Sequence, residues 1–508
     1  MAVETELKLR IAPEQLARLK RHPLLGKHQV ARPVTRRLHN IYYDTPKLEL
    51  RRAEIALRLR RAGRQWLQTL KGGGSVEAGL HRRDEWEIPV SRAALDFSSP
   101  QAAEWEEHLP LRLRKRLQPV FVTDFSRTSR LLDWQGARIE LCMDHGEVRA
   151  GQHSIPVCEL ELELKSGEPA QLFELALALL EIVPLELEPV SKAEQGYRLL
   201  AGHARKPVKS AAPEFARNAS LAEALQALAW SCLGHLQGNL RGAMESDDAE
   251  YLHQMRVALR RLRVVLRLVG KFRADESLDA LSKDVAALCV ALGKVREWDV
   301  FIGETMRPIS RRMAGHAGLK TLLDACERQR AACYAELRGT ERARELQRLI
   351  LRFALWMSGE YWQLPQGEAA PPLRDFASRR LRRLARQFGR AGRQLDSLDD
   401  ARLHALRIVA KKLRYSAEFF AAFYDEQKTG PFLSALSEVQ EVLGRINDVA
   451  VAHRLLDELA ALPELSAHQE AVALAKGWIA HGLSRQLATL RKTVRNFGKQ
   501  KKFWGEAR

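Results

Sequence analysis

Acidic side chains alternate with apolar ones in several short segments of the first two hundred residues. The clearest example places Glu159, Glu161 and Glu163 two residues apart. Residues two apart in a β-strand face the same side of the sheet, so these three carboxylates share one face. Like charges on one face repel unless a cation lies among them. Mg²⁺ and Mn²⁺ prefer carboxylate oxygens, so the pattern indicates a surface that binds a divalent metal.

Basic side chains follow the same two-residue spacing in neighbouring segments. Glu4, Glu6 and Lys8 share one strand face near the start of the chain, and Arg58 and Arg60 share another. Carboxylates, a divalent metal and basic side chains together suit phosphoryl transfer, because charge neutralisation and positioning dominate that reaction. The remaining charged candidates in this part of the chain are Lys71, Arg83, Glu85, Arg127, Asp144 and Lys192.

The opposite faces of these segments are apolar, as at Leu57, Leu59, Leu160 and Leu162. One interpretation turns the apolar faces outward against helices, so that the charged faces line an interior. The alternative, which is more usual for a single strand, turns the charges toward solvent. The three same-face glutamates favour the first interpretation. The sequence contains no GxxxxGK[ST] or GxGxxG loop for nucleotide phosphates and no His/Cys spacing typical of zinc.

A different motif recurs in the second part of the chain. A histidine is followed at steps of 3, 7 and 10 by three basic residues, and the two copies are 151 residues apart. At about 100° per residue, these steps place the four side chains of a copy within an arc of roughly 80° on one helix face. The repeat therefore predicts an internal duplication with two basic ridges. The ridges are His253, Arg256, Arg260 and Arg263, and His404, Arg407, Lys411 and Arg414.

These ridges predict an anionic partner. The stretch 254–270 contains five arginines and no acid, whereas an ordinary solvated helix face mixes the two signs. Aromatic residues are sparse nearby, which disfavours nucleic acid and favours a plain phosphate chain. If the two ridge histidines gain a proton below pH ~6.5, binding should strengthen as the pH falls.

Charge and periodicity divide the 508-residue chain into two parts. The net charge is +19, but residues 1–200 hold 31 Lys and Arg against 28 Asp and Glu, so the excess lies in the second part. Two-residue alternation predicts strands before ~200, interrupted by helices at 12–21 and 169–182. A 3.6-residue period predicts an all-helical region after ~215. We predict an α+β chain with a first domain at 1–201, a linker at 202–213 and a helical domain at 214–508, whose repeats span about 214–364 and 373–508.

Compartment and membrane association can also be judged from composition. The six cysteines contain no CxxC pair, and the N-terminus lacks the apolar segment of a signal peptide. No run of 18 apolar residues is present, so we expect no membrane span. A cytoplasmic location is the expectation.

The two sets of motifs resemble known families. Glu4-x-Glu6-x-Lys8 resembles the ExExK signature of the CYTH superfamily, the triphosphate tunnel metalloenzymes. The family's other motifs follow in its order: Tyr42-Tyr43-Asp44-Thr45, Arg58-x-Arg60, Thr69-x-Lys71, Arg83-x-Glu85, Arg127, Asp144, Glu159-x-Glu161-x-Glu163 and Ser191-Lys192. The helical repeat resembles the CHAD domain. The order CYTH then CHAD is similar to that of bacterial inorganic triphosphatases.

The resemblance implies a fold and a set of roles. The first domain would be an antiparallel β-barrel tunnel, and the second a duplicated helical bundle around a basic cavity that binds polyphosphate on both ridges. Mg²⁺ or Mn²⁺ would be held by Glu4, Glu6 and one or more of Glu159, Glu161 and Glu163, with Glu163 favoured as a direct ligand. Glu85 and Asp144 would bind a second metal or orient the attacking water, beside Lys8. The expected triphosphate contacts are Lys8, Arg58, Arg60, Lys71, Arg83, Arg127 and Lys192.

The resulting hypothesis is a metal-dependent inorganic triphosphatase that hydrolyses PPPi to PPi and Pi and carries a polyphosphate-binding domain. A second hypothesis is hydrolysis of thiamine or nucleoside triphosphate, or adenylate cyclase chemistry. A third is a non-enzymatic protein that binds polyphosphate and is targeted to polyphosphate granules. The expected partners are triphosphate and polyphosphate, with no membrane and no nucleic acid.

Overall fold

The chain forms two compact units in the computed structural model. The first comprises Met1–Lys206 and Ala343–Gly359, and the second Pro207–Arg342 and Glu360–Arg508. The predicted linker at 202–213 and the interval between the two predicted repeats, residues 365–372, lie partly outside the described residues. The structure describes residues 2–77, 79–99, 102, 105–202, 205–211, 213, 215, 219–272, 275–359, 362, 371–393 and 400–505.

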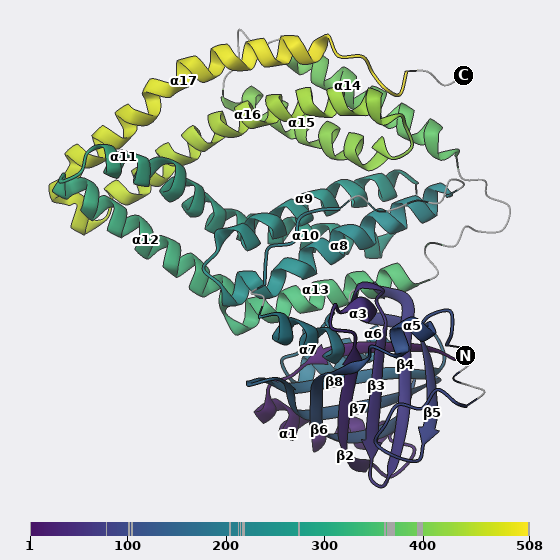
Figure 1. Ribbon diagram of the computed structural model, residues 1–508. Coiled ribbons are helices and arrows are strands. Elements are labelled where there is room, and N and C mark those ends of the chain that lie inside the picture. The colour runs from purple at the N-terminus through teal and green to yellow at the C-terminus, as the bar shows by residue number, and fades with distance from the viewer. Residues whose placement is uncertain are drawn as a thin grey trace. The chain divides into compact units, whose positions relative to one another are not determined.

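Eight antiparallel strands of the first unit close into a barrel (Figure 1), which confirms the predicted fold of this part. The strands pair in the order β5-β4-β3-β2-β6-β7-β8-β1, and β1 also pairs with β5 to complete the ring. A short strand, β9, adds to β1. The bounds are β1 (Ala2–Arg10), β2 (Val34–Asp44), β3 (Ala56–Ala62), β4 (Gln65–Glu77), β5 (Leu80–Val90), β6 (Gln118–Trp134), β7 (Ala137–Ala150), β8 (His153–Ser166) and β9 (Glu186–Leu187).

The barrel turns its apolar faces outward and its charged faces inward. Leu57 and Leu70 pack outside the barrel wall in a cluster with Leu50 and Trp105, and all four are fully buried. The alternate residues of the same strands, such as Arg58 and others described below, line an internal cavity. The first of the two orientations considered for the alternating segments is therefore the one adopted.

Helices cover the outside of the barrel and bring in one further charged residue. Helix α6 contacts β1 and β8, and α7 contacts β6, β7 and β8. Gly196 lets α7 lie close against the barrel, because a Cβ there would fall 2.3 Å from the Phe121 ring. The close approach places Lys192, the first residue of α7, at the barrel interior. The helices are α1 (Pro13–Lys20), α2 (Pro23–His28), α3 (Glu49–Arg52), α5 (Leu111–Arg114), α6 (Ala170–Ile182) and α7 (Lys192–Ala201).

A segment from within the helical part of the chain belongs to the first unit. Most of helix α13 (Thr340–Ser358) packs with the barrel. The Leu187 amide donates a hydrogen bond of 3.1 Å to Gln347 Oε1, and Arg348 makes two hydrogen bonds of 3.0 and 3.1 Å to Glu181. The barrel unit is therefore not made from the N-terminal residues alone.

The second unit is all helical, as the sequence predicts. Helix α9 packs against α8 and α10, and α15 packs against α14 and α16 (Figure 1). Among the described residues, no helix is both long enough and apolar enough to cross a membrane. The elements are α8 (Leu221–Glu245), α9 (Ala249–Phe272), α10 (Glu276–Val300), a π-helical turn η1 (Phe301–Met306), α11 (Arg307–Arg312), α12 (Ala317–Arg338), α14 (Leu373–Gly392), α15 (Asp400–Ala421), α16 (Glu426–Ala460), a 3₁₀ turn η4 (Pro463–His468) and α17 (Gln469–Gly498).

Candidate active site and a second cationic cavity

The barrel encloses a cavity of about 1190 Å³ lined by side chains from most of its strands. All seven residues predicted to contact triphosphate line it. Of the predicted carboxylates, five line it as well, whereas Glu159 and Asp144 lie behind the wall. The lining residues among the predictions are Lys8, Arg58, Arg60, Lys71, Arg83, Arg127, Lys192, Glu4, Glu6, Glu85, Glu161 and Glu163.

Three arginines lie close together on one part of the wall. Arg58, Arg60 and Arg127 come from β3 and β6, and their charges act on one another. Burial, together with Arg58 and Arg127, lowers the pKa of Arg60 to about 10. Its Nε donates to the uncharged Asn40 Oδ1 at 3.1 Å. The arginines repel one another, and a bound polyanion would reduce this unfavourable electrostatic energy.

Another part of the wall carries a row of carboxylates on neighbouring strands. Strand register pairs Glu6 with Glu163 and Glu163 with Glu140, so the three lie side by side on β1, β8 and β7. Burial raises the pKa of Glu163, and the neighbouring Glu4 and Glu140 raise it further. Lys165 Nζ lies 2.5 Å from Glu163 and 3.2 Å from Glu140 at the exposed side of the row. A row of crowded carboxylates of this kind fits a divalent cation that keeps some of its waters.

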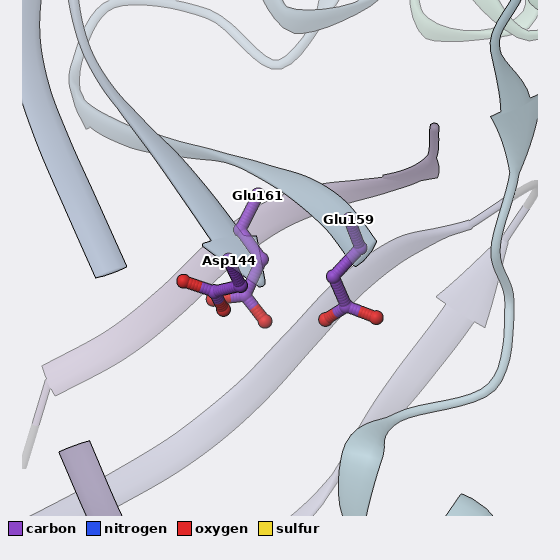
Figure 2. A group of neighbouring side chains, drawn as sticks. All are labelled: Asp144, Glu159 and Glu161. Atoms are coloured by element: carbon purple, nitrogen blue, oxygen red, sulfur yellow. The ribbon is translucent and has the colours of Figure 1, made fainter. Parts of the chain in front are cut away.

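Asp144 and Glu159, behind the wall, form a tight group of buried carboxylates with Glu161 of the cavity lining (Figure 2). One oxygen of each lies within 4.8 Å of the others, a spacing that could hold a metal. Lys192 already occupies this position: its Nζ is 2.6 Å from Asp144 and 2.9 Å from Glu161, and it also bonds Glu159.

Two more cations complete the charge balance of the buried group. Arg127 makes a bidentate pair with Asp144 at 2.8 and 2.7 Å and also bonds Glu161, and Lys8 bonds Glu161 from β1. Lys8 Nζ also lies 2.9 Å from Glu6, so the three cations contact the three carboxylates of this group and one carboxylate of the row. The group fits a structural ion-pair network that positions Lys8, Arg127 and Lys192, whereas the Glu6–Glu163–Glu140 row fits a metal better.

Glu85 faces the cavity among basic side chains. Lys71 Nζ lies 3.3 Å from Glu85 and also bonds Glu4, and Arg58 Nη2 lies 3.5 Å from Glu85. Burial opposes ionisation of Glu85, but Lys71, Arg58 and Arg60 outweigh it and hold its pKa below the ordinary value. An ionised carboxylate with a low pKa is a weak general base but a good hydrogen-bond acceptor for a water.

The structure adds residues that the sequence analysis missed. Arg36 lines the cavity from β2, in register with Arg127, and among the described residues it has no ion-pair partner. Arg36 shares its strand face with Leu38 and Asn40, and this spacing could have identified it. The exposed Arg37 next to it obscured the alternation of the strand. Glu140 also lines the cavity, and its place in the carboxylate row depends on strand register.

The second unit contains a separate cavity of about 1280 Å³. Both predicted ridges face it, one on α9 and one on α15. Seven of the eight predicted residues line it, namely His253, Arg256, Arg260, His404, Arg407, Lys411 and Arg414. Arg263 does not line the cavity and lies near Arg267 and Cys289 instead.

The cavity in the second unit is strongly cationic. Its wall contains eight Arg and Lys side chains and five acids, and the sequence analysis missed Arg296 and Arg445. Burial and the neighbouring Arg407, Arg260 and Arg256 lower the pKa of Lys411 to about 6. Among the described residues, Lys411 has no hydrogen-bond or ion-pair partner. An anion bound beside this lysine would stabilise its charged form.

Burial shifts the titration of one ridge histidine, His253. Burial and the nearby Arg296 lower the pKa of His253 to about 4. His253 is therefore neutral at physiological pH, and the expectation that both histidines gain charge below pH ~6.5 is wrong for this residue. The cause is tertiary, because Arg296 comes from α10 and approaches His253 only in the folded unit.

Comparison with known families matches both parts of the chain. Residues 2–197 match the family model of the CYTH domain, and residues 227–457 match that of the CHAD domain. The inorganic triphosphatase of Haemophilus influenzae is 35% identical over 208 residues, which cover 39% of this chain and 55% of that protein. The chain thus spans about half the length of that relative.

Two further similarities extend over the helical part. An uncharacterized protein of Mycobacterium tuberculosis is 27% identical over 453 residues, 81% of this chain and 82% of that protein. The crystal structure of the CHAD domain from the plant Ricinus communis is 31% identical, with a TM-score of 0.49, and covers 57% of this chain and 97% of that domain.

Proposed function

The chain belongs to the CYTH and CHAD families, and we propose that it is a metal-dependent inorganic triphosphatase with a polyphosphate-binding helical domain. The reaction is hydrolysis of PPPi to PPi and Pi in the barrel cavity. The named Haemophilus relative, similar over this part of the chain, supports a triphosphate-hydrolysing activity.

The surplus of cations in the barrel cavity is the observation that carries the proposal. Arg58, Arg60 and Arg127 crowd one wall, and burial together with the other two arginines lowers the pKa of Arg60 to about 10. Triphosphate carries its charge on three successive phosphates and has no apolar portion. A cavity lined by cations from several strands matches that distribution better than it matches a base or a thiazole ring.

Within this proposal, the metal site is the carboxylate row. Glu4, Glu6 and Glu163 would hold Mg²⁺ or Mn²⁺, with Glu140 beside them. When bound, the ion would neutralise phosphate oxygens and stabilise the charge that develops during P–O cleavage. Glu161 and Glu159 are assigned to the ion-pair network, because Lys192, Lys8 and Arg127 already neutralise them.

The chain's own residues bind the substrate and position water. Lys8, Arg58, Arg60, Lys71, Arg83, Arg127 and Lys192 would donate hydrogen bonds to phosphate oxygens. Glu85, ionised and facing the cavity, would accept a hydrogen bond from the attacking water. The water oxygen forms a bond to the terminal phosphorus while the anhydride P–O bond breaks, and PPi departs with the bonding electrons. Asp144 would act from behind the wall by orienting Arg127 and Lys192.

A substrate panel with the full chain tests this function. Phosphate release is measured from PPPi, ATP and thiamine triphosphate with Mg²⁺ and with Mn²⁺, and cyclic AMP is measured in the ATP reaction. We expect kcat/KM for PPPi to exceed that for ATP by at least ~10-fold, because the cavity offers cations for phosphates and no motif for a base. Preference for an organic triphosphate, or cyclic AMP formation, would promote the second hypothesis. No turnover on any substrate would favour a polyphosphate-binding protein located at granules.

The helical cavity is proposed to bind inorganic polyphosphate. Ridges from both repeats line one cavity, whose eight Arg and Lys side chains outnumber its acids. A flexible phosphate chain can enter such a space, whereas a rigid duplex cannot. Polyphosphate binding by the full chain is measured with metal removed by EDTA, and Arg256→Ala with Arg407→Ala is expected to weaken it at least ~10-fold. Unchanged binding by this variant would contradict the assignment.

A further inference from the structure

A row of arginines lies on helix α14, outside the helical cavity. Five of them fall within an arc of about 100° and extend over about 16 Å of the helix, taking 100° and 1.5 Å per residue. All five side chains are exposed, while Leu381, Leu384 and Phe388 bury the opposite face of the helix. We define the α14 arginine row as Arg379, Arg382, Arg383, Arg386 and Arg390.

The α14 arginine row has no acidic partner in the folded unit. Within the part of the chain that the structure describes, none of the five arginines has an ion pair or a hydrogen bond. Helix α14 carries one acid, Asp375, in its first turn. Like charges at these helix spacings repel by a few tenths of a kcal/mol per pair. An ordinary solvated helix face would carry acids among its basic residues. The row therefore indicates a binding surface for an external anion.

The row is electrostatically continuous with the basic ridge of α9. Arg380, at the edge of the row, has its pKa lowered by burial and by Arg383 and Arg267. Lys412 of α15 has its pKa lowered by burial and by Arg267, Arg380 and Arg263. Arg263 is the ridge residue that lies outside the cavity, whereas Arg256 and Arg260 of the same ridge line it. Basic side chains therefore continue from the cavity wall along α9 to α14.

We propose that the α14 arginine row is a second binding site for inorganic polyphosphate, which holds the part of a long chain that extends beyond the helical cavity. This inference rests on the polyphosphate function proposed for that cavity. Two linked sites on one chain bind by avidity, so the row selects for chain length. Nucleic acid fits less well, because Phe376 and Phe388 of α14 pack against Phe420 and Phe497 and offer no platform for bases.

The test compares chain lengths on two charge-matched variants of the full chain. The first variant, Arg382→Gln/Arg383→Gln/Arg386→Gln, removes three exposed charges from the row. The second, Arg311→Gln/Arg312→Gln/Lys320→Gln, removes three exposed charges from α11 and α12 in the same unit. Dissociation constants are measured at low salt, with metal removed by EDTA, for chains of a few phosphates, for chains of several hundred, and for duplex DNA. Circular dichroism verifies that both variants fold.

We expect the row variant to lose at least ~10-fold in affinity for long chains, while its affinity for short chains stays within ~2-fold of wild type. The control variant should retain long-chain binding, apart from a small general effect of net charge. Equal long-chain affinity of the row variant and the control would overturn the inference while leaving the cavity assignment intact. Failure of the wild type to bind short chains would overturn the cavity assignment itself. Tighter binding of DNA than of polyphosphate, lost in the row variant alone, would replace polyphosphate by nucleic acid.

Discussion

Arg260 of α9 donates a hydrogen bond from Nε to the Tyr415 hydroxyl of α15 at 3.2 Å, across 155 residues of sequence. The donor belongs to the first basic ridge, and the acceptor follows the second ridge by one residue. This bond ties the two repeats together at the wall of one cavity. The duplicated ridges thus form two sides of a single site and not two separate sites.

Removing a carboxylate from the row should abolish hydrolysis without unfolding the barrel. Glu6→Gln and Glu163→Gln each conserve volume but remove a hard anionic ligand. We expect kcat for PPPi to fall by at least ~100-fold, in line with a loss of transition-state charge stabilisation, together with weaker Mn²⁺ binding by calorimetry. Glu14→Gln, on the exposed face of α1, is the matched control. Full turnover by Glu163→Gln at low metal would rule out this metal site.

Lys192 should be essential for the stability of the barrel as well as for activity. Lys192→Met leaves Asp144, Glu159 and Glu161 with one cation fewer in a buried space. Breaking a buried ion pair in this way costs about 3–5 kcal/mol of unfolding free energy. Without Lys192, the folded state would hold these carboxyl groups at raised pKa values. The deficit should then shrink as the pH falls, because protonation removes the uncompensated charge. Thermal unfolding from pH 8 to pH 5 measures both effects, and a pH-independent deficit would contradict the charge argument.

Polyphosphate binding by the helical cavity should strengthen as the pH falls from 8 toward 6. Arg407 on α15 and Arg256 and Arg260 on α9 lower the pKa of Lys411 to about 6, with Asp448 of α16 acting in the opposite sense. A bound anion favours the charged form, so binding takes up a proton above this pKa and becomes pH-independent below it. Arg stays protonated throughout, so Lys411→Arg should flatten the profile.

His253 provides the control for that profile. Its pKa of about 4 keeps it neutral between pH 6 and pH 8, so His253→Gln should leave the slope unchanged. Fluorescence anisotropy of labelled polyphosphate at constant ionic strength gives both profiles. A slope that persists in Lys411→Arg and disappears in His253→Gln would assign the proton to the histidine.

A fragment ending at residue 206 should retain activity but lose stability. The fragment keeps every candidate ligand of the metal and of triphosphate. It lacks the α13 segment, in which Gln347 accepts a hydrogen bond from the Leu187 amide and Arg348 pairs with Glu181. Loss of these contacts should cost about 1–2 kcal/mol in unfolding free energy. Urea unfolding of the fragment and of full-length Gln347→Leu measures this cost. Equal stability of fragment and full chain would mean that α13 adds nothing to the barrel.

Much of the barrel site could be predicted from spacing together with the resemblance to the CYTH superfamily. Two-residue alternation predicted that Glu4, Glu6 and Lys8 share one strand face. The seven cations predicted to contact triphosphate all line the cavity. Spacing does not separate Glu159 from Glu163, because both lie on the same face of the same strand, and only the family resemblance favours Glu163 as a direct ligand. Register decides between them: Glu163 stands opposite Glu6 and Glu140, whereas Glu159 meets Lys192 from a helix that follows later in the chain.

The helical part shows the same division. The repeat of His253 and its three partners, 151 residues apart, determined two basic ridges, because a 3.6-residue period fixes which side chains share a helix face. Periodicity is a local property, and the sequence by itself sufficed for it. Other features depend on which helices pack together. The ridges share one cavity, Arg263 lies outside it, burial and Arg296 lower the pKa of His253, and α13 joins the barrel. Packing joins residues of different helices, where burial and the charge of both partners decide the contact, so only the tertiary structure decided these features.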